Sequence, residues 1–143
     1  MKAKEFLLQL EKLDRLIENK LIEKEQWKSI ATGTTAKIGS ERVQSSGSQQ
    51  KMADAVVKYV ELEAEIDHCI DDLIDTKKKV IGVIEQLQPT EYDILHMVYV
   101  QHLTFFDVAQ KYKMSYSWAT TIHGRALKDV QKILETRCKS EGV

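Results

Sequence analysis

The sequence predicts an all-α protein, with a long antiparallel helical hairpin or coiled coil over residues 1–87 and shorter helices over residues 88–143. Apolar residues recur every three or four positions along most of the chain, which is the period of a buried helix face. A Ser or Thr precedes each short C-terminal segment as a candidate helix cap, and the only proline, Pro89, marks a helix boundary. A content of 43% apolar and 30% charged residues is typical of a globular helical protein.

The composition also excludes several classes of protein. No apolar run approaches the roughly 20 residues that cross a bilayer, and the first residues lack the pattern of a signal peptide. Cys69 and Cys138 are far apart, and together they suggest neither a disulfide framework nor a zinc site. We therefore expect a cytoplasmic protein that is not inserted in a membrane and that binds no metal or cofactor.

Residues 2–28 are expected to form the first helix, because an apolar face alternates there with a face of Lys and Glu. The apolar face consists of Phe6, Leu10, Leu13, Ile17 and Leu21. Residues 29–50 are rich in Ser, Thr and Gly and have no hydrophobic period, so we expect a flexible linker there.

Residues 49–87 carry the longest helical pattern, a seven-residue repeat over about five heptads. The repeat forms a seam of Met52, Ala55, Tyr59, Leu62, Ile66, Cys69, Leu73, Thr76, Val80, Val83 and Leu87. One helix cannot bury such a seam alone, so the pattern requires a partner helix. The helix over residues 2–28 can fold back against it, but it is shorter, so part of the seam is expected to stay open.

A second copy of the chain is expected to cover the open part of the seam, which makes the protein a homodimer. The residues assigned to this oligomerisation are Tyr59, Leu62, Ile66, Leu73 and Val80. A purely intramolecular hairpin is the alternative.

The C-terminal part predicts three short helices separated by turns. Pro89 ends the long helix, and Thr90 is expected to cap a helix whose apolar face includes Ile94, Leu95, Val98 and Tyr99. The next turn is placed at Gln101 and His102. Thr104 is expected to cap a helix over residues 105–112, and Ser115 a last helix that buries Ala119, Ile122, Ala126, Val130 and Ile133.

The last two helices and their tight turn match the layout of a DNA-reading helix-turn-helix. Ala109 supplies the small residue where the two helices meet. Lys113 occupies the turn position that Gly usually fills, so we expect a less comfortable backbone angle or a different turn there. Trp118 is interpreted either as part of the core or as an exposed anchor for DNA or a protein.

The outward positions near the start of the last helix are the expected base-facing residues, and they are Tyr116, Ser117, Thr120 and Thr121. We expect the two Thr side chains to be exposed to solvent. The positions suited to phosphate contact are Lys111, Lys113, Arg125 and Lys128. Because the base-facing set contains no Arg, Lys, Asn or Gln, direct readout is expected to be modest.

Charge is distributed unevenly along the chain. The formal net charge is −1, which argues against a non-specific binder of polyanions. Residues 116–139 nevertheless hold 5 basic and 2 acidic side chains, so positive charge gathers on the last helix, where phosphates would lie. An ordinary solvated helix face is the alternative interpretation.

A family resemblance follows from these motifs. Leu87-Gln88-Pro89-Thr90-Glu91 resembles, with one inserted residue, the opening of region 4 of sigma-70-type factors, and Arg125-Ala126-Leu127 resembles its end. The whole arrangement is similar to the RinA/ArpU-like late regulators of phages and prophages in Gram-positive bacteria. The resemblance implies a regulator that binds double-stranded DNA, controls phage or prophage genes and contacts RNA polymerase.

Two other functions are compatible with the same helices. A phage small terminase subunit also joins a helix-turn-helix to oligomerisation helices, although its DNA domain usually comes first. A coiled-coil adaptor without DNA binding is the second, and the weak base-reading set favours it. The sequence has no phosphate-binding Gly loop and no nucleophile-base motif, so we expect no enzyme. The acidic run over residues 61–75 is interpreted as a solvated face, with metal binding or DNA mimicry as alternatives.

Overall fold

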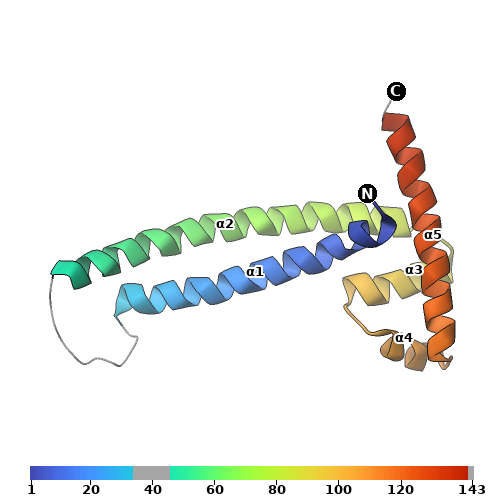
Figure 1. Cartoon of the computed structure of the whole chain (residues 1–143), viewed down its shortest axis with the longest axis horizontal. Helices are drawn as coiled ribbons and strands as arrows, with labels where there is room; N and C mark the ends of the chain where they lie inside the picture. Colours follow the sequence, from blue (N-terminus) through green and yellow to red (C-terminus); the bar gives the residue numbers. More distant parts are fainter. Residues whose placement is uncertain (34–45, 142–143) are drawn as a thin grey trace. The chain divides into compact units, whose positions relative to one another are not determined.

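The structure, a computed structural model, describes residues 1–33 and 46–141, and every regular element in these residues is helical (Figure 1). In chain order the helices are α1 (Ala3–Thr32), α2 (Ser46–Ile84), α3 (Pro89–Leu95), the π-helical turn η2 (His96–Val100), α4 (Phe105–Tyr112) and α5 (Tyr116–Glu141). The all-α fold class predicted from the hydrophobic period is therefore confirmed.

Contacts between residues divide the chain into two compact units. The terminal unit combines residues 1–13 with residues 73–143, and the two-helix unit comprises residues 14–72. This division differs from the boundary that the sequence placed after residue 87. The reason is that apolar side chains at the start of α1 and at the end of α2 join the core of the C-terminal helices.

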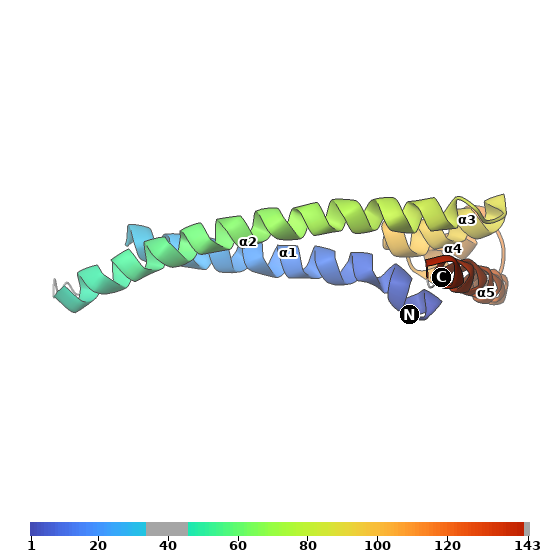
Figure 2. The same cartoon turned by 90° about the horizontal axis from the view of Figure 1, so that it is seen from above.

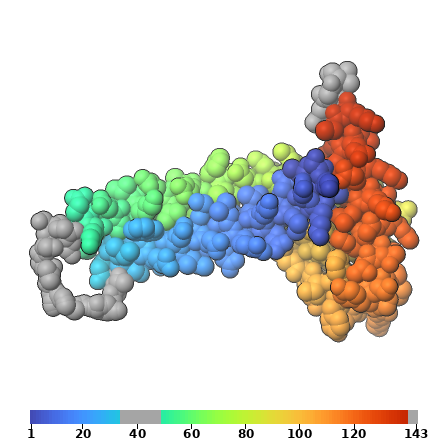
Figure 3. All heavy atoms as spheres, in the orientation of Figure 1, coloured from blue at the N-terminus to red at the C-terminus, as the bar shows by residue number. Residues whose placement is uncertain are grey.

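The larger core of the terminal unit is built from segments that are distant in sequence. Its fully buried side chains include Leu7 of α1, Ile84 of α2 and Val130 of α5. The backbone N–H of Ala3 donates to Oε1 of Gln131 at 2.7 Å, which attaches the start of α1 to α5. Figure 3 shows the first residues of α1 lying directly against α5. Because burial of a large aliphatic side chain contributes about 1.5–3 kcal/mol, the first turns of α1 stabilise the C-terminal helices.

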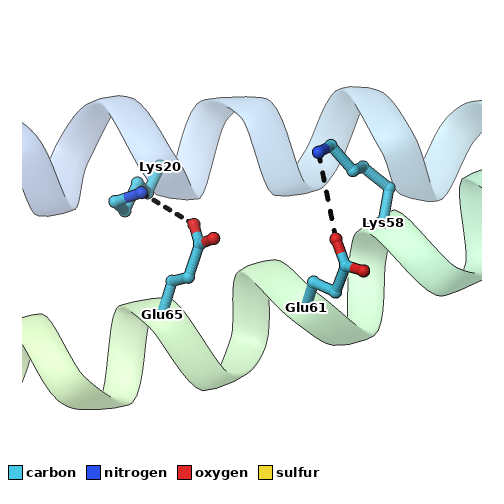
Figure 4. A network of polar contacts seen from close by, with 4 residues as sticks. All are labelled: Lys20, Lys58, Glu61 and Glu65. Carbon is cyan, nitrogen blue, oxygen red and sulfur yellow. Dashed lines mark hydrogen bonds and ion pairs between the residues drawn. The ribbon is translucent and has the colours of Figure 1, made fainter.

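In the two-helix unit, the two helical segments lie side by side and run in opposite directions (Figure 2). Lys20 Nζ lies 2.8 Å from Glu65 Oε2, and Lys24 Nζ lies 3.2 Å from Glu63 Oε1. The hydrogen bond between Lys20 and Glu65 raises the pKa of Lys20 and lowers the pKa of Glu65. Figure 4 shows the pair between Lys20 and Glu65. Solvent screens such pairs, so they show which residues of the two helices lie level with each other but contribute little to stability.

The heptad seam of α2 is covered within a single chain. Leu62, Ile66 and Val80 are buried, and Tyr59 and Leu73 are half-buried. The sequence assigned these five residues to oligomerisation on the expectation that part of the seam stays open. That expectation is wrong for them, because α1 already occupies this face and leaves none of the five fully exposed.

Register explains why the seam is covered. The pairing of Lys24 with Glu63 in an antiparallel arrangement brings the end of α1 level with Ala55, which is fully buried. Helix α1 is also longer than predicted, since it continues to Thr32. Met52 alone among the described seam positions is exposed, because it lies beyond that end.

The predicted linker over residues 29–50 is wrong at both ends. Helix α1 includes Ser29 to Thr32, and α2 already begins at Ser46. The Thr32 hydroxyl donates to the carbonyl of Lys28 at 2.9 Å, so this polar side chain is satisfied inside the helix. Helix α1 is followed by Gly33 at φ +70°, a backbone angle that Gly adopts without strain. The rest of the predicted linker, residues 34–45, lies outside the described residues.

The junction between α2 and α3 also differs from the sequence prediction. Helix α2 ends at Ile84, before residue 87. Pro89 is the first residue of α3, Gln88 before it is extended, and no side chain caps the helix. The predicted cap at Thr90 is therefore wrong. A proline needs no N–H partner at the first helical position and keeps the preceding residue extended, so the helix begins two residues earlier than a cap at Thr90 would place it.

Candidate nucleic-acid interface

Helix α4 begins at a reciprocal pair of hydrogen bonds. The backbone N–H of Asp107 donates to the Thr104 hydroxyl at 3.1 Å, and the backbone N–H of Thr104 donates to the Asp107 carboxylate at 3.1 Å. The predicted cap at Thr104 is confirmed, and Asp107 completes a capping box that the sequence analysis had not identified. The start of α4 is therefore determined by local sequence.

The turn between α4 and α5 contains a residue in the left-handed region. Lys113 has φ +56° and ψ +40°, so of the two expectations for this position the less comfortable backbone angle is the one observed. The backbone N–H of Met114 donates to the carbonyl of Ala109 at 2.9 Å and closes the turn. The Ser115 hydroxyl accepts from the backbone N–H of Trp118 at 3.0 Å, so the predicted cap of the last helix is confirmed.

A small second core joins the inner faces of α3, α4 and α5. Ile94, Val108, Ala109 and Ala119 are buried in it. The small side chains of Ala109 and Ala119 leave room for α4 and α5 to approach closely. Trp118 is half-buried against this cluster, which agrees with the core interpretation of this residue.

A polar contact adds to this second core. The Tyr112 hydroxyl donates to Oδ2 of Asp93 at 2.7 Å, and its ring lies 5.2 Å from that of Trp118. Burial and the bond to Asp93 raise the pKa of Tyr112 to about 12. The tyrosine therefore stays protonated near neutral pH and links α4 to α3.

The four predicted base-facing residues differ in solvent exposure. Tyr116, Ser117 and Thr121 are exposed, but Thr120 is half-buried. The Thr120 hydroxyl donates to the carbonyl of Ser117 at 3.0 Å, within its own helix. The expectation of two exposed Thr side chains is thus correct for Thr121 and wrong for Thr120. Thr120 lies on the same side as His123, and this side faces a cavity that the start of α1 helps to line.

The four predicted phosphate-contacting side chains are all exposed: Lys111, Lys113, Arg125 and Lys128. Two of them belong to α5 and two lie at its junction with α4. On α5, Arg125 and Lys128 follow the exposed Thr121 by one and two turns. Exposed cations therefore lie on both sides of the exposed polar residues at the start of α5.

Glu91 has a buried carboxyl group that the sequence pattern does not predict. This side chain is only 3% exposed, and no donor in the described residues bonds to either of its oxygens. Burial raises the pKa of Glu91 to about 7, the nearby Asp129 carboxyl adds to the shift, and the Arg125 cation opposes it. Glu91 lies in the first turn of α3, where an acid is ordinary, so only tertiary contacts set it apart.

In the described part of the chain, no group of three or more His, Cys, Asp and Glu side chains could hold a metal ion. No helix there is long and apolar enough to cross a membrane. Cys69 is buried and Cys138 is exposed, and both are free thiols.

Comparison with known proteins identifies a family but no characterised relative. No curated protein and no solved structure matches the chain. A family model described as "Protein of unknown function (DUF1492)" matches residues 33–131. The matched range contains all of α2, α3, η2 and α4, together with the part of α5 that carries the exposed polar and basic residues. Because the match covers well over half of the sequence, the chain belongs to the DUF1492 family.

Proposed function

We propose that this protein is a sequence-specific DNA-binding regulator of transcription, with α4 and α5 acting as a helix-turn-helix. The proposal rests on the different solvent exposure of two faces of α5. Ala119, Ala126 and Val130 are fully buried on one side, whereas Ser117 and Thr121 are exposed on another. The cap at Ser115 and the turn before it hold this helix by its inner face, as a recognition helix requires.

The exposed residues at the start of α5 have the chemistry for contacts in the major groove. Ser117 and Thr121 are four residues apart and therefore neighbours on one helix face. Their hydroxyls can bond to base edges, and the Thr121 methyl can contact a thymine methyl. Tyr116 extends this face and is 57% exposed. Thr120 is assigned to packing within the protein, which leaves a small set of base-reading groups.

Charge on α5 supports the same orientation. Arg125 and Lys128 are exposed beyond the base-reading residues and suit the phosphate backbone. Asp129, one of the acidic residues of α5, lies beside the buried Glu91 and is itself half-buried. The exposed charge of this helix is therefore more positive than its sequence alone indicates, and phosphate binding is expected to depend on salt.

We further propose a homodimer, because few base-reading groups per chain call for two half-sites. The heptad seam is not available, but the two-helix unit exposes other large apolar side chains. They include Leu21, Ile22, Val56, Val57 and Val60. Val56 and Val60 are one turn apart on α2 and therefore adjoin, and adjoining exposed apolar side chains are typical of an interaction surface. Control of phage or prophage genes and contact with RNA polymerase are proposed on the resemblance to sigma region 4 alone.

Measured DNA binding tests this function. Selection from a library of random duplexes should enrich one sequence, and fluorescence anisotropy should then show preference for it over a scrambled duplex. Thr121→Ala should weaken specific binding by about 1 kcal/mol, roughly fivefold, and spare non-specific binding. Thr136→Ala is the matched control, because Thr136 is exposed on the same helix and its hydroxyl bonds to the helix backbone.

Two results would contradict the proposal. If selection enriches no sequence and the wild type does not distinguish duplexes from its own genomic locus, the chain does not read DNA by itself. Equal losses from Thr121→Ala and Thr136→Ala would place the contact elsewhere on the protein. In the first case, the adaptor function without DNA binding would become the better explanation.

A further inference from the structure

A cavity of about 540 Å³ lies in the terminal unit, and the proposed DNA contacts do not use it. Four segments surround it: the start of α1, the turn η2 with the loop after it, the first residue of α4, and the first part of α5. All four belong to the same compact unit. The volume lies within the range of about 300–1,000 Å³ that is typical of small-molecule sites.

Apolar side chains form the body of this cavity. Leu8 of α1, Val98 of η2 and Leu103 of the following loop line it together with Phe105. The Phe105 ring lies 4.7 Å from the His123 ring, nearly perpendicular to it. Aliphatic side chains beside a pair of rings suit a flat or branched apolar group of a ligand.

Tyr99 and His123 form a polar part of the cavity. A hydrogen bond of 2.7 Å joins the Tyr99 hydroxyl and Nε2 of His123, and their rings stack with centroids 5.6 Å apart. Burial lowers the pKa of His123, and the nearby Lys4 ammonium lowers it further. The imidazole is therefore neutral near pH 7, and the charge in this part comes from Lys4.

The charges on α1 select among possible ligands. Lys4 attracts an anionic group to the part where His123 lies. Glu11 also lines the cavity, seven residues further along α1 and therefore about 10 Å away. It lies close enough to Tyr99 to help raise the pKa of that hydroxyl to about 12, after the larger effect of burial. A second negative charge on the ligand would be repelled by Glu11, so one acidic group is favoured over two.

We propose that this cavity binds a small monocarboxylic acid with a flat or branched apolar body, and that its occupation weakens DNA binding. The carboxylate contacts Lys4 and the apolar body fills the space beside Leu8 and Phe105. The effect on DNA rests on the proposed function. Thr120 and His123 belong to the first turns of α5, so a bound carboxylate adds negative charge to the helix that approaches the phosphates.

The local backbone supports a functional role for this region. The turn η2 is π-helical, and π-helical turns inside helices are frequent at functional sites. It ends where the backbone N–H of Gln101 donates to the carbonyl of His96 at 2.9 Å. His102, which also lines the cavity, then adopts φ +60°. A non-glycine residue in the left-handed region costs about 1–3 kcal/mol, and such costs gather at binding sites.

Titration of the full-length chain with phenylacetate, followed by ¹⁵N NMR, tests the binding step without DNA. The amides of Tyr99, Thr120 and His123 should shift in a saturable way, with Kd on the order of 1 mM for a probe of this size. Phenylacetamide, which has the same body without the charge, should bind at least about fivefold more weakly. Lys4→Gln should weaken phenylacetate binding by the same factor, whereas Lys12→Gln, an exposed control on the same helix, should not.

The binding step is overturned if phenylacetate causes no saturable shifts, or if acid and amide bind equally. Equal affinity of the wild type and the Lys4→Gln variant would also overturn it. The NMR spectrum of each variant reports its folding in the same experiment. Because no DNA is present, a negative result here leaves the proposed DNA-binding function unaffected.

The coupling step is measured by anisotropy on the selected duplex. Saturating phenylacetate should weaken specific DNA binding by about fivefold in the wild type, and Lys4→Gln should need about fivefold more phenylacetate for the same effect. Sodium chloride at equal ionic strength is the control, since salt alone weakens DNA binding. Bound acid with unchanged DNA affinity would overturn the coupling and leave the acid site standing. A wild type that binds no DNA would overturn the coupling together with the proposed function.

Discussion

At the scale of single residues, Glu91 has an environment that makes the protein sensitive to pH. Its carboxyl group is buried beside the carboxyl of Asp129. The Arg125 cation lowers the pKa of Glu91 by less than burial and Asp129 raise it. Two carboxyl groups this close favour a shared proton, because two negative charges would repel each other. The folded protein therefore binds a proton here that an unfolded chain releases more easily.

The free energy of unfolding is expected to fall as pH rises from about 5 to about 8. The pKa of Glu91 is about 7 in the folded chain against a model value of 4.5, so the folded state holds the proton more tightly across this window. The stabilisation is complete below the lower value and is lost as pH rises through the upper one. The loss should be about 2 kcal/mol, measured by urea unfolding at several pH values.

Glu91→Gln should remove most of this pH dependence, because the amide does not titrate. Glu85→Gln is the matched control, since Glu85 is exposed just after α2. If the wild type and Glu91→Gln lose stability equally between these pH values, another group is responsible.

At the scale of helices, the seam of α2 and its exposed side chains have different roles. Ile66 is buried against α1, so it stabilises a single chain. Val60 lies on the same helix but is 56% exposed, and it belongs to the surface proposed for a second copy. The sequence pattern placed self-association on the seam. The structure moves the proposed dimer surface to side chains outside the seam.

Two substitutions separate these roles. Ile66→Ala should lower the free energy of unfolding by about 2–4 kcal/mol at every protein concentration, because it leaves a cavity inside one chain. Val60→Glu should leave the fold intact and shift the dimer toward monomer, because it places a charge in the proposed interface. Urea unfolding and sedimentation measure the two effects. If the wild type sediments as a monomer at micromolar concentrations, the dimer proposal is wrong. If the effect of Ile66→Ala depends on protein concentration, the dimer interface includes the seam.

At the scale of the whole molecule, the terminal unit needs both ends of the sequence. Residues 1–13 supply Phe6, Leu7 and Leu10 to the core that contains Ala126 and Val130 of α5. The family match begins only at residue 33, so this part of the core lies outside it. The proposed recognition helix is therefore held partly by a segment that is more than a hundred residues away in sequence.

Leu7→Ala is expected to destabilise the terminal unit by about 2–4 kcal/mol, since Leu7 is fully buried. Trp118 fluorescence in a Trp27→Phe background reports unfolding of this unit during urea titration. Leu16→Ala is the control on the same helix, because Leu16 is 43% exposed and its loss should cost less than about 1 kcal/mol. Equal effects of the two substitutions would mean that the start of α1 does not stabilise the C-terminal helices.

Local features of the chain were determined by the sequence alone. The helical class, the caps at Thr104 and Ser115, the left-handed Lys113 and the inner face of α5 all follow from residues within about four positions of each other. Capping, turn geometry and helix periodicity act over this short range, so a linear pattern contains them. The same pattern placed the ends of α1 and α2 wrongly, because Ser, Thr and Gly only weakly disfavour a helix that packing stabilises.

Burial by distant segments was decided only by the tertiary structure. The start of α1 packs against α5, α1 covers the seam of α2, and Glu91 lies beside Asp129. Each of these contacts joins residues that are dozens of positions apart, so no local period records them. Thr120 shows the consequence. Its position on α5 predicted an exposed residue that contacts DNA bases, but Thr120 is half-buried and lines a cavity that α1 also lines. The solvent exposure of a side chain depends on every segment that packs against it. Its own helix covers only part of the side-chain surface.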